Sequence, residues 1–214
     1  MILIEKGVEP ASLVRYRRTP GADFDGLDKA ELRERLLEEQ GHLCAYCMQR
    51  IPVKGMMKIE HYEKRTAENQ LAYQNLLAVC PGNENVKNKK GRVNPERFTC
   101  DTKKGDAVLH INPQKQSDID TISYNNGRIC SDNPQYQEDF DHILNLNDEF
   151  GFLITNRQKA MQTLENKLRK VDNRKDALPL LKKWKKHYDQ KSTEYAPYIG
   201  IIRWYIDRQI RKHT

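Results

Sequence analysis

Four of the five cysteines of this chain fall within one stretch of its sequence. Cys44 and Cys47 form a CxxC pair, and Cys80 and Cys100 follow at longer spacings. Two thiolates three positions apart can hold one tetrahedral zinc ion when two further ligands come from elsewhere, and Cys80 and Cys100 are the candidates. The alternative is four buried, unpaired cysteines, which are common in protein cores. A redox site is disfavoured, because no βαβ pattern surrounds the CxxC pair.

Side chains that could hydrolyse a phosphodiester lie among these cysteines. Glu60 and His61 are adjacent. Asn75 opens the next apolar run, and Asp101 directly follows the last cysteine of the set. A neutral histidine suits a general base at neutral pH, and carboxylates are hard oxygen ligands for Mg²⁺. Each residue alone has an ordinary explanation, such as a solvated charge or a chain turn. Their joint order is what favours hydrolytic chemistry.

The surrounding pattern predicts short elements near these residues. Residues 28–40 predict a helix with one apolar stripe. Residues 42–105 are rich in Cys, His, Asn and Gly, and they predict short strands and loops. Two further strands are predicted at Ala107–Ile111 and Ile119–Tyr124, followed by a hairpin turn at Asn125-Asn126-Gly127.

The last third of the chain predicts helices. Apolar residues recur at three- and four-residue steps from Met161 to Val171, and a helical pattern continues from Leu178 to Tyr188. The run from Tyr198 to Ile210 predicts a closing amphipathic helix. Its apolar stripe could fill the core or could dock another protein.

Composition narrows the class of protein. The chain has 214 residues, with 37 Lys and Arg, 30 Asp and Glu, a net charge of +7 and a mean hydropathy of −0.88. No stretch approaches the roughly 18 apolar residues that a membrane span needs. The start of the sequence lacks a secretory apolar segment, so a cytoplasmic protein is expected. In that reducing compartment, paired cysteines more often bind metal than form disulfides.

Basic residues gather in two places. Residues 81–99 have almost no apolar side chains and predict an exposed, flexible loop. The cations of this loop are Lys87, Lys89, Lys90, Arg92 and Arg97. Both ends of the loop are tethered at the proposed zinc, so its cations would lie near the active site and attract a phosphate backbone. A merely solvated loop is the alternative. A second run, from Lys167 to Lys186, alternates with apolar residues and favours a solvated helix face.

Four motifs occur within residues 44–106, in the order CAYC, IEH, NLLAVCPGNE and CDTKKGD. In this order they resemble the HNH endonucleases, and most closely the branch of PtuB nucleases found in Septu antiviral systems and in some retrons. Further matches are the INP segment at 111–113 and the LNLN segment at 144–147, with Arg157 downstream. The resemblance covers most of residues 1–160, and it implies a ββα-metal core.

The resemblance also implies a role for each polar residue. His61 would be the general base, and the amide oxygen of Asn75 would orient its imidazole. Glu60 and Asp101 would hold one catalytic divalent cation, Mg²⁺ or Mn²⁺, in addition to the structural zinc. Lys104, one helical turn after Asp101, would contact the phosphate backbone or cap the site electrostatically.

The sequence departs from the usual HNH pattern at two points. The second zinc pair of the family is usually CxxC, but the position three after Cys80 is not a cysteine, so the fourth ligand must be Cys100. Asp101 stands where the family has a histidine or asparagine ligand. Glu84 and His110 therefore stay open as alternatives to Asp101 for the second ligand of the catalytic metal.

Together these patterns predict an α+β protein with three parts. Residues 1–41 would form an N-terminal arm and helix, and residues 42–136 a zinc-stapled ββα-metal (HNH) nuclease core with the basic insertion 81–99. Residues 137–214 would form a helical C-terminal region. The resemblance implies a metal-dependent endonuclease that cleaves nucleic acid, with DNA the favoured substrate, as the effector of a bacterial antiviral defence complex.

The resemblance implies partners as well. These are an ABC- or SMC-like ATPase of the PtuA type and, in retrons, a reverse transcriptase with its DNA–RNA product (msDNA). Two alternative functions stay open. One is an HNH nuclease that cleaves RNA such as tRNA. The other is a non-catalytic zinc-knuckle protein that only binds nucleic acid or serves as a scaffold.

Overall fold

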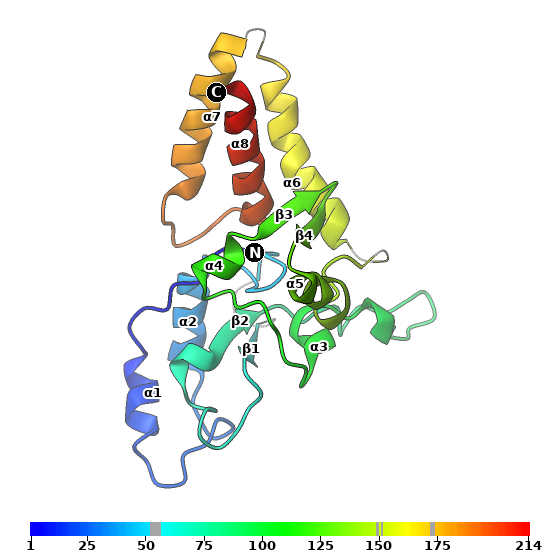
Figure 1. The fold of residues 1–214 in the computed structure, drawn as a ribbon. Helices are drawn as coiled ribbons and strands as arrows, with labels where there is room; N and C mark the ends of the chain where they lie inside the picture. The colour runs from blue at the N-terminus through cyan, green and yellow to red at the C-terminus, as the bar shows by residue number, and fades with distance from the viewer. Residues whose placement is uncertain (52–56, 149, 151, 172–173) are drawn as a thin grey trace.

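The computed structural model describes residues 1–51, 57–148, 150, 152–171 and 174–214. Helices and two short antiparallel hairpins alternate along the chain (Figure 1), which confirms the predicted α+β class. The elements are α1 (Ala11–Tyr16), α2 (Ala30–Glu39), β1 (Lys58–His61), β2 (Leu76–Val79), α3 (Cys100–Lys104), α4 (Gln116–Ile119), β3 (Ile122–Asn125), β4 (Arg128–Ser131), α5 (Pro134–Glu138), α6 (Leu153–Leu168), α7 (Arg174–Asp189) and α8 (Ile199–His213). Single helical turns at Tyr73–Asn75, Pro95–Arg97 and Asp139–Ile143 complete the described structure.

A hairpin followed by a short helix forms the centre of the molecule. β1 and β2 pair antiparallel, with Glu60 opposite Leu77 and His61 opposite Leu76. All four residues of β2 are buried, because they are apolar and lie between the hairpin partner and the helices around it. The next described helix is α3, which begins at Cys100. The pattern of residues 42–105 predicts strands and loops, so α3 is a helix that it misses, whereas the order strand, strand, helix is the one that the family resemblance implies.

The predicted helix at residues 28–40 is confirmed, since α2 occupies Ala30–Glu39 and buries its leucine stripe. The predicted strand at Ala107–Ile111 is wrong. The buried carboxylate of Asp139 accepts hydrogen bonds from the main-chain N–H groups of His110 and Ile111, at 2.7 and 2.8 Å. A side chain distant in sequence therefore satisfies the donors that a strand neighbour would have satisfied.

The second predicted strand is confirmed only in its later part. Residues 116–119 form the helix α4, and β3 begins at Ile122. The hairpin turn is confirmed, although Asn125 closes β3 and the turn itself consists of Asn126 and Gly127. Both turn residues have a positive φ, 47° and 80°, as the tight turns favoured between antiparallel strands require.

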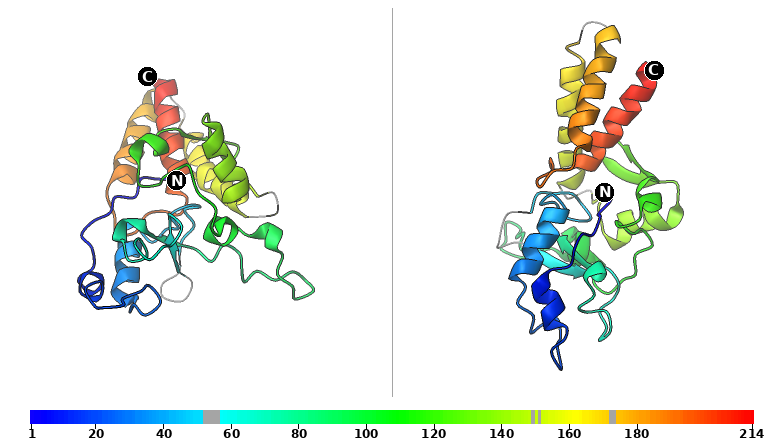
Figure 2. Two further views of the ribbon diagram at one scale, coloured as in Figure 1. Left: turned by 60° about the horizontal axis from the view of Figure 1, so that its bottom comes forward. Right: turned by 90° about the vertical axis from the view of Figure 1, so that its left-hand side faces the viewer.

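The last three helices pack together and stand apart from the β1–β2 hairpin (Figures 1 and 2). α8 contacts both α6 and α7. Its apolar stripe is buried, with Ile202, Tyr205 and Ile206 packed against Leu164 of α6. Of the two uses left open for this stripe, core packing is thus the one observed. No helix in the described ranges is both long and apolar enough to cross a membrane.

Arg157 joins this helical unit to the rest of the fold. It lies on α6 with only 1% of its surface exposed. Its guanidinium donates hydrogen bonds to the carbonyl oxygens of Gly127 and Leu146 and to the side chain of Asn147. The two carbonyls belong to the β3–β4 turn and to the segment before α6, so one side chain holds three parts of the chain together.

We expect Arg157→Met to lower the free energy of unfolding by about 3 kcal/mol, because methionine leaves two buried carbonyls without a donor. The matched control is Lys159→Met, an exposed position on the same helix, with an expected change within about 0.5 kcal/mol. Denaturant unfolding in the presence of zinc measures both variants. Equal stability of the two variants would contradict this role of Arg157.

Candidate active site

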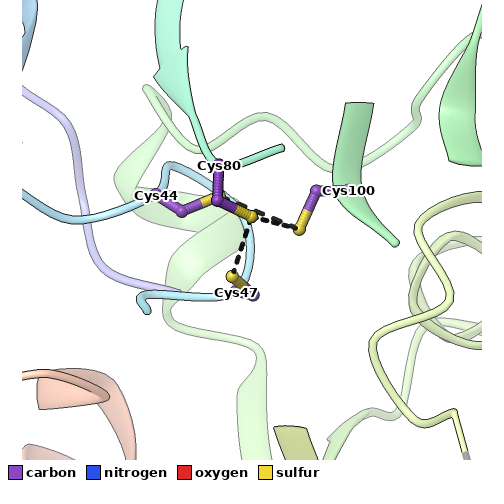
Figure 3. Close-up of side chains that lie close together, drawn as sticks. All are labelled: Cys44, Cys47, Cys80 and Cys100. Carbon is purple, nitrogen blue, oxygen red and sulfur yellow. Dashed lines mark hydrogen bonds between the residues drawn. The ribbon is translucent and has the colours of Figure 1, made fainter. Parts of the chain in front are cut away.

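The four cysteines at positions 44, 47, 80 and 100 converge on one point (Figure 3). All four are buried, and their sulfur atoms lie within 4.8 Å of one another. The Sγ–Sγ distances are 3.8 Å from Cys44 to Cys100, 3.8 Å from Cys47 to Cys80 and 3.7 Å from Cys80 to Cys100. The predicted four-cysteine cluster is therefore confirmed, including Cys100 as the member that lies across the basic loop.

The cluster has the dimensions and chemistry of a zinc site. A tetrahedron with zinc–sulfur distances of about 2.3 Å has edges of about 3.8 Å, as observed here. Burial opposes ionisation of Cys44, but hydrogen bonds with the neighbouring thiols lower its pKa well below the usual range. Hydrogen bonds with the same neighbours, together with burial, raise the pKa of Cys100 well above it. Only a bound cation would let all four sulfurs be thiolates, so the cluster is consistent with structural zinc.

The cluster joins three segments of the chain. Cys44 and Cys47 lie on the turn after α2, Cys80 directly follows β2, and Cys100 begins α3. Beside it, Thr99 N–H donates to the carbonyl of Gly82 at 3.0 Å, which closes the loop between β2 and α3. Gly82 has φ +56°, and a Cβ there would lie 2.2 Å from the Thr99 carbonyl oxygen, so only glycine fits this closure.

Glu60 lies buried at the centre of the site. Its Oε1 accepts a hydrogen bond from the Tyr46 hydroxyl at 3.0 Å and pairs with the Lys104 ammonium at 2.8 Å. Burial raises the pKa of Glu60 to about 8, and a hydrogen bond and charge from Asp101 add to the shift. Two carboxyl groups this close are a candidate site for a divalent ion, whose charge would offset their mutual repulsion.

His61 is adjacent to Glu60 and is half-buried. Its Nε2 lies 3.0 Å from the carbonyl oxygen of Gln70, which can only accept, so Nε2 carries the hydrogen and Nδ1 keeps a lone pair. The Phe24 ring packs edge-on against the imidazole at a centroid distance of 4.5 Å. Burial lowers the pKa of His61, so the ring is neutral at pH 7. The geometry leaves Nδ1 as the basic atom.

Asn75 does not hold the imidazole directly, which corrects the contact expected from the sequence. Its Oδ1 accepts from the Glu63 main-chain N–H at 2.7 Å, and its Nδ2 donates to the Glu63 carbonyl at 3.2 Å. The amide therefore fixes the chain two residues after His61, at the open end of the hairpin. The group that orients the ring is the main-chain carbonyl of Gln70.

The environment of Lys104 also differs from the one that the predicted phosphate contact requires. Its side chain is only 2% exposed, and its ammonium lies against Glu60 and 3.3 Å from the His61 carbonyl oxygen. Its charge instead stabilises the buried carboxylate of Glu60, which is the alternative role expected for Lys104 from the sequence. Lys58 is the more accessible cation, and it bridges Glu84 at 2.8 Å and Asp101 at 3.5 Å.

The three candidates for the second metal ligand occupy different surroundings. Asp101 is partly exposed, and its carboxyl group lies close enough to Glu60 to raise the pKa of that residue. Glu84 is linked to Asp101 through Lys58, whose ammonium forms ion pairs with both carboxylates. His110 faces Asp139, with its Nδ1 3.1 Å from that carboxylate. Of the three, Asp101 is the candidate that adds to the raised pKa of Glu60.

Hydrogen bonds within the basic loop, residues 81–99, hold the main chain that carries its cations. A bridge pairs Lys87 with Val93, and Asn83 donates to the Arg97 carbonyl at 2.9 Å. The loop extends away from the body of the molecule beyond α3 (Figure 1). Four of its five cations are exposed, and Arg97 is half-buried beside the ring of Phe150.

Three contacts of the site were not expected from the sequence. Tyr46, which lies between Cys44 and Cys47, donates a hydrogen bond to Glu60. Gln70 orients the His61 ring through its main-chain carbonyl, so the identity of its side chain could not have indicated this contact. Lys58 lies two residues before Glu60 on β1 and so on the same face of the strand, which is a pattern that could have identified it.

The chain is similar to a known protein over part of its length. In an alignment of 148 positions that covers 60% of the chain, the sequence is 32% identical to a protein of Vibrio cholerae serotype O1 biovar El Tor named "Retron Vc95 putative HNH endonuclease". The match spans 66% of that protein, just under two thirds of its length. No family model matches the chain. No solved structure matches it. The chain is thus a distant homologue of a protein that carries a retron and HNH name.

We expect Cys100→Ser to abolish tight binding of one zinc ion per chain and to lower the unfolding temperature, because a structural zinc contributes on the order of 10 kcal/mol to folding. Cys130→Ser is the matched control, since Cys130 is a half-buried cysteine outside the cluster. Zinc content by mass spectrometry and a thermal melt measure both. A Cys100→Ser chain that retains zinc at the wild-type affinity would show that the cluster is not the metal site.

Proposed function

We propose that this chain is a metal-dependent HNH endonuclease that hydrolyses phosphodiesters of nucleic acid, with DNA as its substrate. The observation that carries the proposal is the buried Glu60 set against Asp101 beside His61, where a hairpin and a helix are clamped by four cysteines. A general base, two oxygen ligands and a rigid support are the parts that metal-assisted hydrolysis requires. The distant homologue with an HNH name supports the same class.

His61 would act as the general base. Because Nε2 donates to Gln70, the lone pair on Nδ1 can accept a proton from water. The oxygen of that water then bonds to phosphorus, the bond from phosphorus to the leaving oxygen breaks, and the leaving oxygen takes a proton from solvent. Asn75 supports this geometry by fixing the main chain at Glu63.

Glu60 and Asp101 would hold the catalytic cation, Mg²⁺ or Mn²⁺. When bound, that ion supplies Lewis-acid stabilisation of the charge that develops on the phosphate and the leaving oxygen. The residues present fit this use. Tyr46 and Lys104 both contact Oε1 of Glu60, which fixes the carboxylate, and Asp101 is open enough to be reached from solvent.

The proposed setting is a bacterial antiviral complex. The retron in the name of the homologue supports a reverse transcriptase and its DNA–RNA product as partners of this chain. The sequence motifs support two further parts of the proposal. One is a partner ATPase of the ABC- or SMC-like PtuA type, and the other is membership of this chain in the PtuB branch. Lys87, Lys89, Lys90 and Arg92 are exposed on the loop between β2 and α3 and would contact the substrate backbone near the site.

His61→Ala removes the proposed base, and we expect cleavage to fall at least about a hundredfold. Zinc content and circular dichroism should match the wild type. The control is His142→Ala, an exposed histidine, which should cleave normally. Plasmid DNA and purified tRNA, with Mg²⁺ and with the retron partners present, serve as parallel substrates. Cleavage of tRNA alone would replace DNA by RNA in the proposal, and wild-type cleavage by His61→Ala would refute the mechanism.

Asp101→Asn tests which residue completes the cation site. We expect it to weaken Mn²⁺ binding about tenfold or more, which corresponds to at least about 1.4 kcal/mol, because a neutral amide is a poorer ligand than a carboxylate. Glu84→Gln removes the same charge one step further out and should change the affinity less than about threefold. Titration of Mn²⁺ by electron paramagnetic resonance, without nucleic acid, measures both. The reverse ranking would assign the ligand to Glu84.

A further inference from the structure

The net positive charge of this chain falls in its C-terminal part. Residues 153–214 hold 16 Lys and Arg and 6 Asp and Glu, a net charge of +10. Residues 1–152 hold 21 Lys and Arg and 24 Asp and Glu, a net charge of −3. The part of the protein that contains the candidate active site is therefore slightly acidic, despite its basic loop. Any surface that attracts a polyanion over a long range must lie largely on the helices.

These cations are accessible. Among the ion pairs of the helical unit, Lys185 and Arg203 pair with aspartates of the same unit, and Lys191 pairs with Glu5. Ten further basic residues have exposed side chains and no carboxylate partner among the side chains that the structure describes. They are Lys159, Lys167, Arg169, Lys170, Lys182, Lys183, Lys186, Arg208, Arg211 and Lys212.

Six of the ten gather at one end of the unit, which we call the arm tip. α6 and α8 run in the same direction, and both end far from the β1–β2 hairpin (Figures 1 and 2). Arg169 near the end of α6 lies beside Tyr205 in the middle of α8, so α8 continues past the end of α6. The arm tip consists of Lys167, Arg169, Lys170, Arg208, Arg211 and Lys212.

A helix face that is merely solvated does not account for this arrangement. Cations in the last turn of a helix interact favourably with its dipole, which explains one or two at each end. Six cations on the outer turns of the two helices repel one another, and that repulsion is relieved when a polyanion binds. The arrangement therefore favours a binding surface over the solvated face that the sequence pattern suggests.

The chemistry of the arm tip fits a nucleic acid better than a protein. Protein interfaces are centred on buried apolar or aromatic anchors. The large exposed apolar residues of the described chain are Val8, Val86, Val108, Phe150 and Phe152, all before residue 153. The arm tip instead presents long cationic side chains, which is the composition of surfaces that contact phosphates.

We propose that the arm tip binds the phosphate backbone of nucleic acid at a distance from the active site. The 15 residues of α8 span about 22 Å, so this contact is separate from any contact that the loop between β2 and α3 makes. The proposal rests on the proposed nuclease function for the identity of the polyanion. It gives the enzyme a second point of attachment, which carries no sequence information and holds a long substrate near the site.

The test compares two variants that lose the same charge. The tip variant is Lys167→Gln, Lys170→Gln, Arg211→Gln and Lys212→Gln together. The control variant is Arg15→Gln, Arg18→Gln, Arg33→Gln and Lys115→Gln together, four exposed positions outside the helical unit. Fluorescence anisotropy with a labelled 30-base-pair DNA duplex, and with labelled tRNA, measures Kd at several KCl concentrations. No divalent cation is added, so cleavage does not interfere.

We expect the tip variant to raise Kd about tenfold or more near 0.1 M KCl and to lower the slope of log K against log salt by roughly 3. The control variant should change Kd less than about threefold. Since the substituted residues are exposed, both variants should unfold at the wild-type midpoint. Equal weakening in the two variants would mean that only net charge matters, and unchanged binding by the tip variant would exclude the surface. Either result overturns the proposal.

The two proposals fail in different ways. If the wild type cleaves DNA with Mg²⁺ but the tip variant binds both probes like the wild type, the arm tip is excluded and the nuclease stands. If the tip variant loses binding but the wild type cleaves neither DNA nor RNA, the arm tip stands and the nuclease function is excluded. A wild-type chain that binds neither probe at low salt contradicts the arm tip as well.

Discussion

The approach of four sulfur atoms to within 4.8 Å of one another is the contact on which the rest of this structure depends. Cys80 ends the hairpin, Cys100 begins the next helix, and Cys44 and Cys47 belong to the turn after α2. The strands and the helix involved are four or five residues long, too short to be stable alone in water. A metal that binds all four thiolates adds folding free energy that these short elements do not supply alone.

The position of the active-site groups follows from that clamp. Glu60 lies on the strand paired with β2, and Asp101 is the second residue of α3, so joining β2 to α3 brings the two carboxylates together. Tyr46 adds a direct connection, because it lies between the two knuckle cysteines and donates to Glu60. Burial, and after it the closeness of Asp101, raises the pKa of Glu60, and a divalent cation would favour its ionised form.

Much of this arrangement could be predicted from the sequence, because cysteine spacing and motif order carry it. The four-cysteine cluster and the α+β class are examples. The contacts of single side chains could not be predicted, since they depend on tertiary distances. Asp139 replaces a strand neighbour for residues 110 and 111, and Asn75 reaches the Glu63 main chain instead of the imidazole. The uneven division of charge, by contrast, is present in the sequence and becomes meaningful once α6 and α8 are seen to run in the same direction, away from the β1–β2 hairpin.

The central claim is that a zinc ion clamps the hairpin to the helix and thereby builds a cation site between Glu60 and Asp101. The most direct test is a crystal structure of the protein soaked in Mn²⁺, with anomalous difference maps recorded at the zinc and manganese edges. The account predicts a zinc peak about 2.3 Å from all four cysteine sulfurs and a separate manganese peak touching both carboxylates. A map with no zinc among the sulfurs, or with manganese bound away from Glu60 and Asp101, would contradict it.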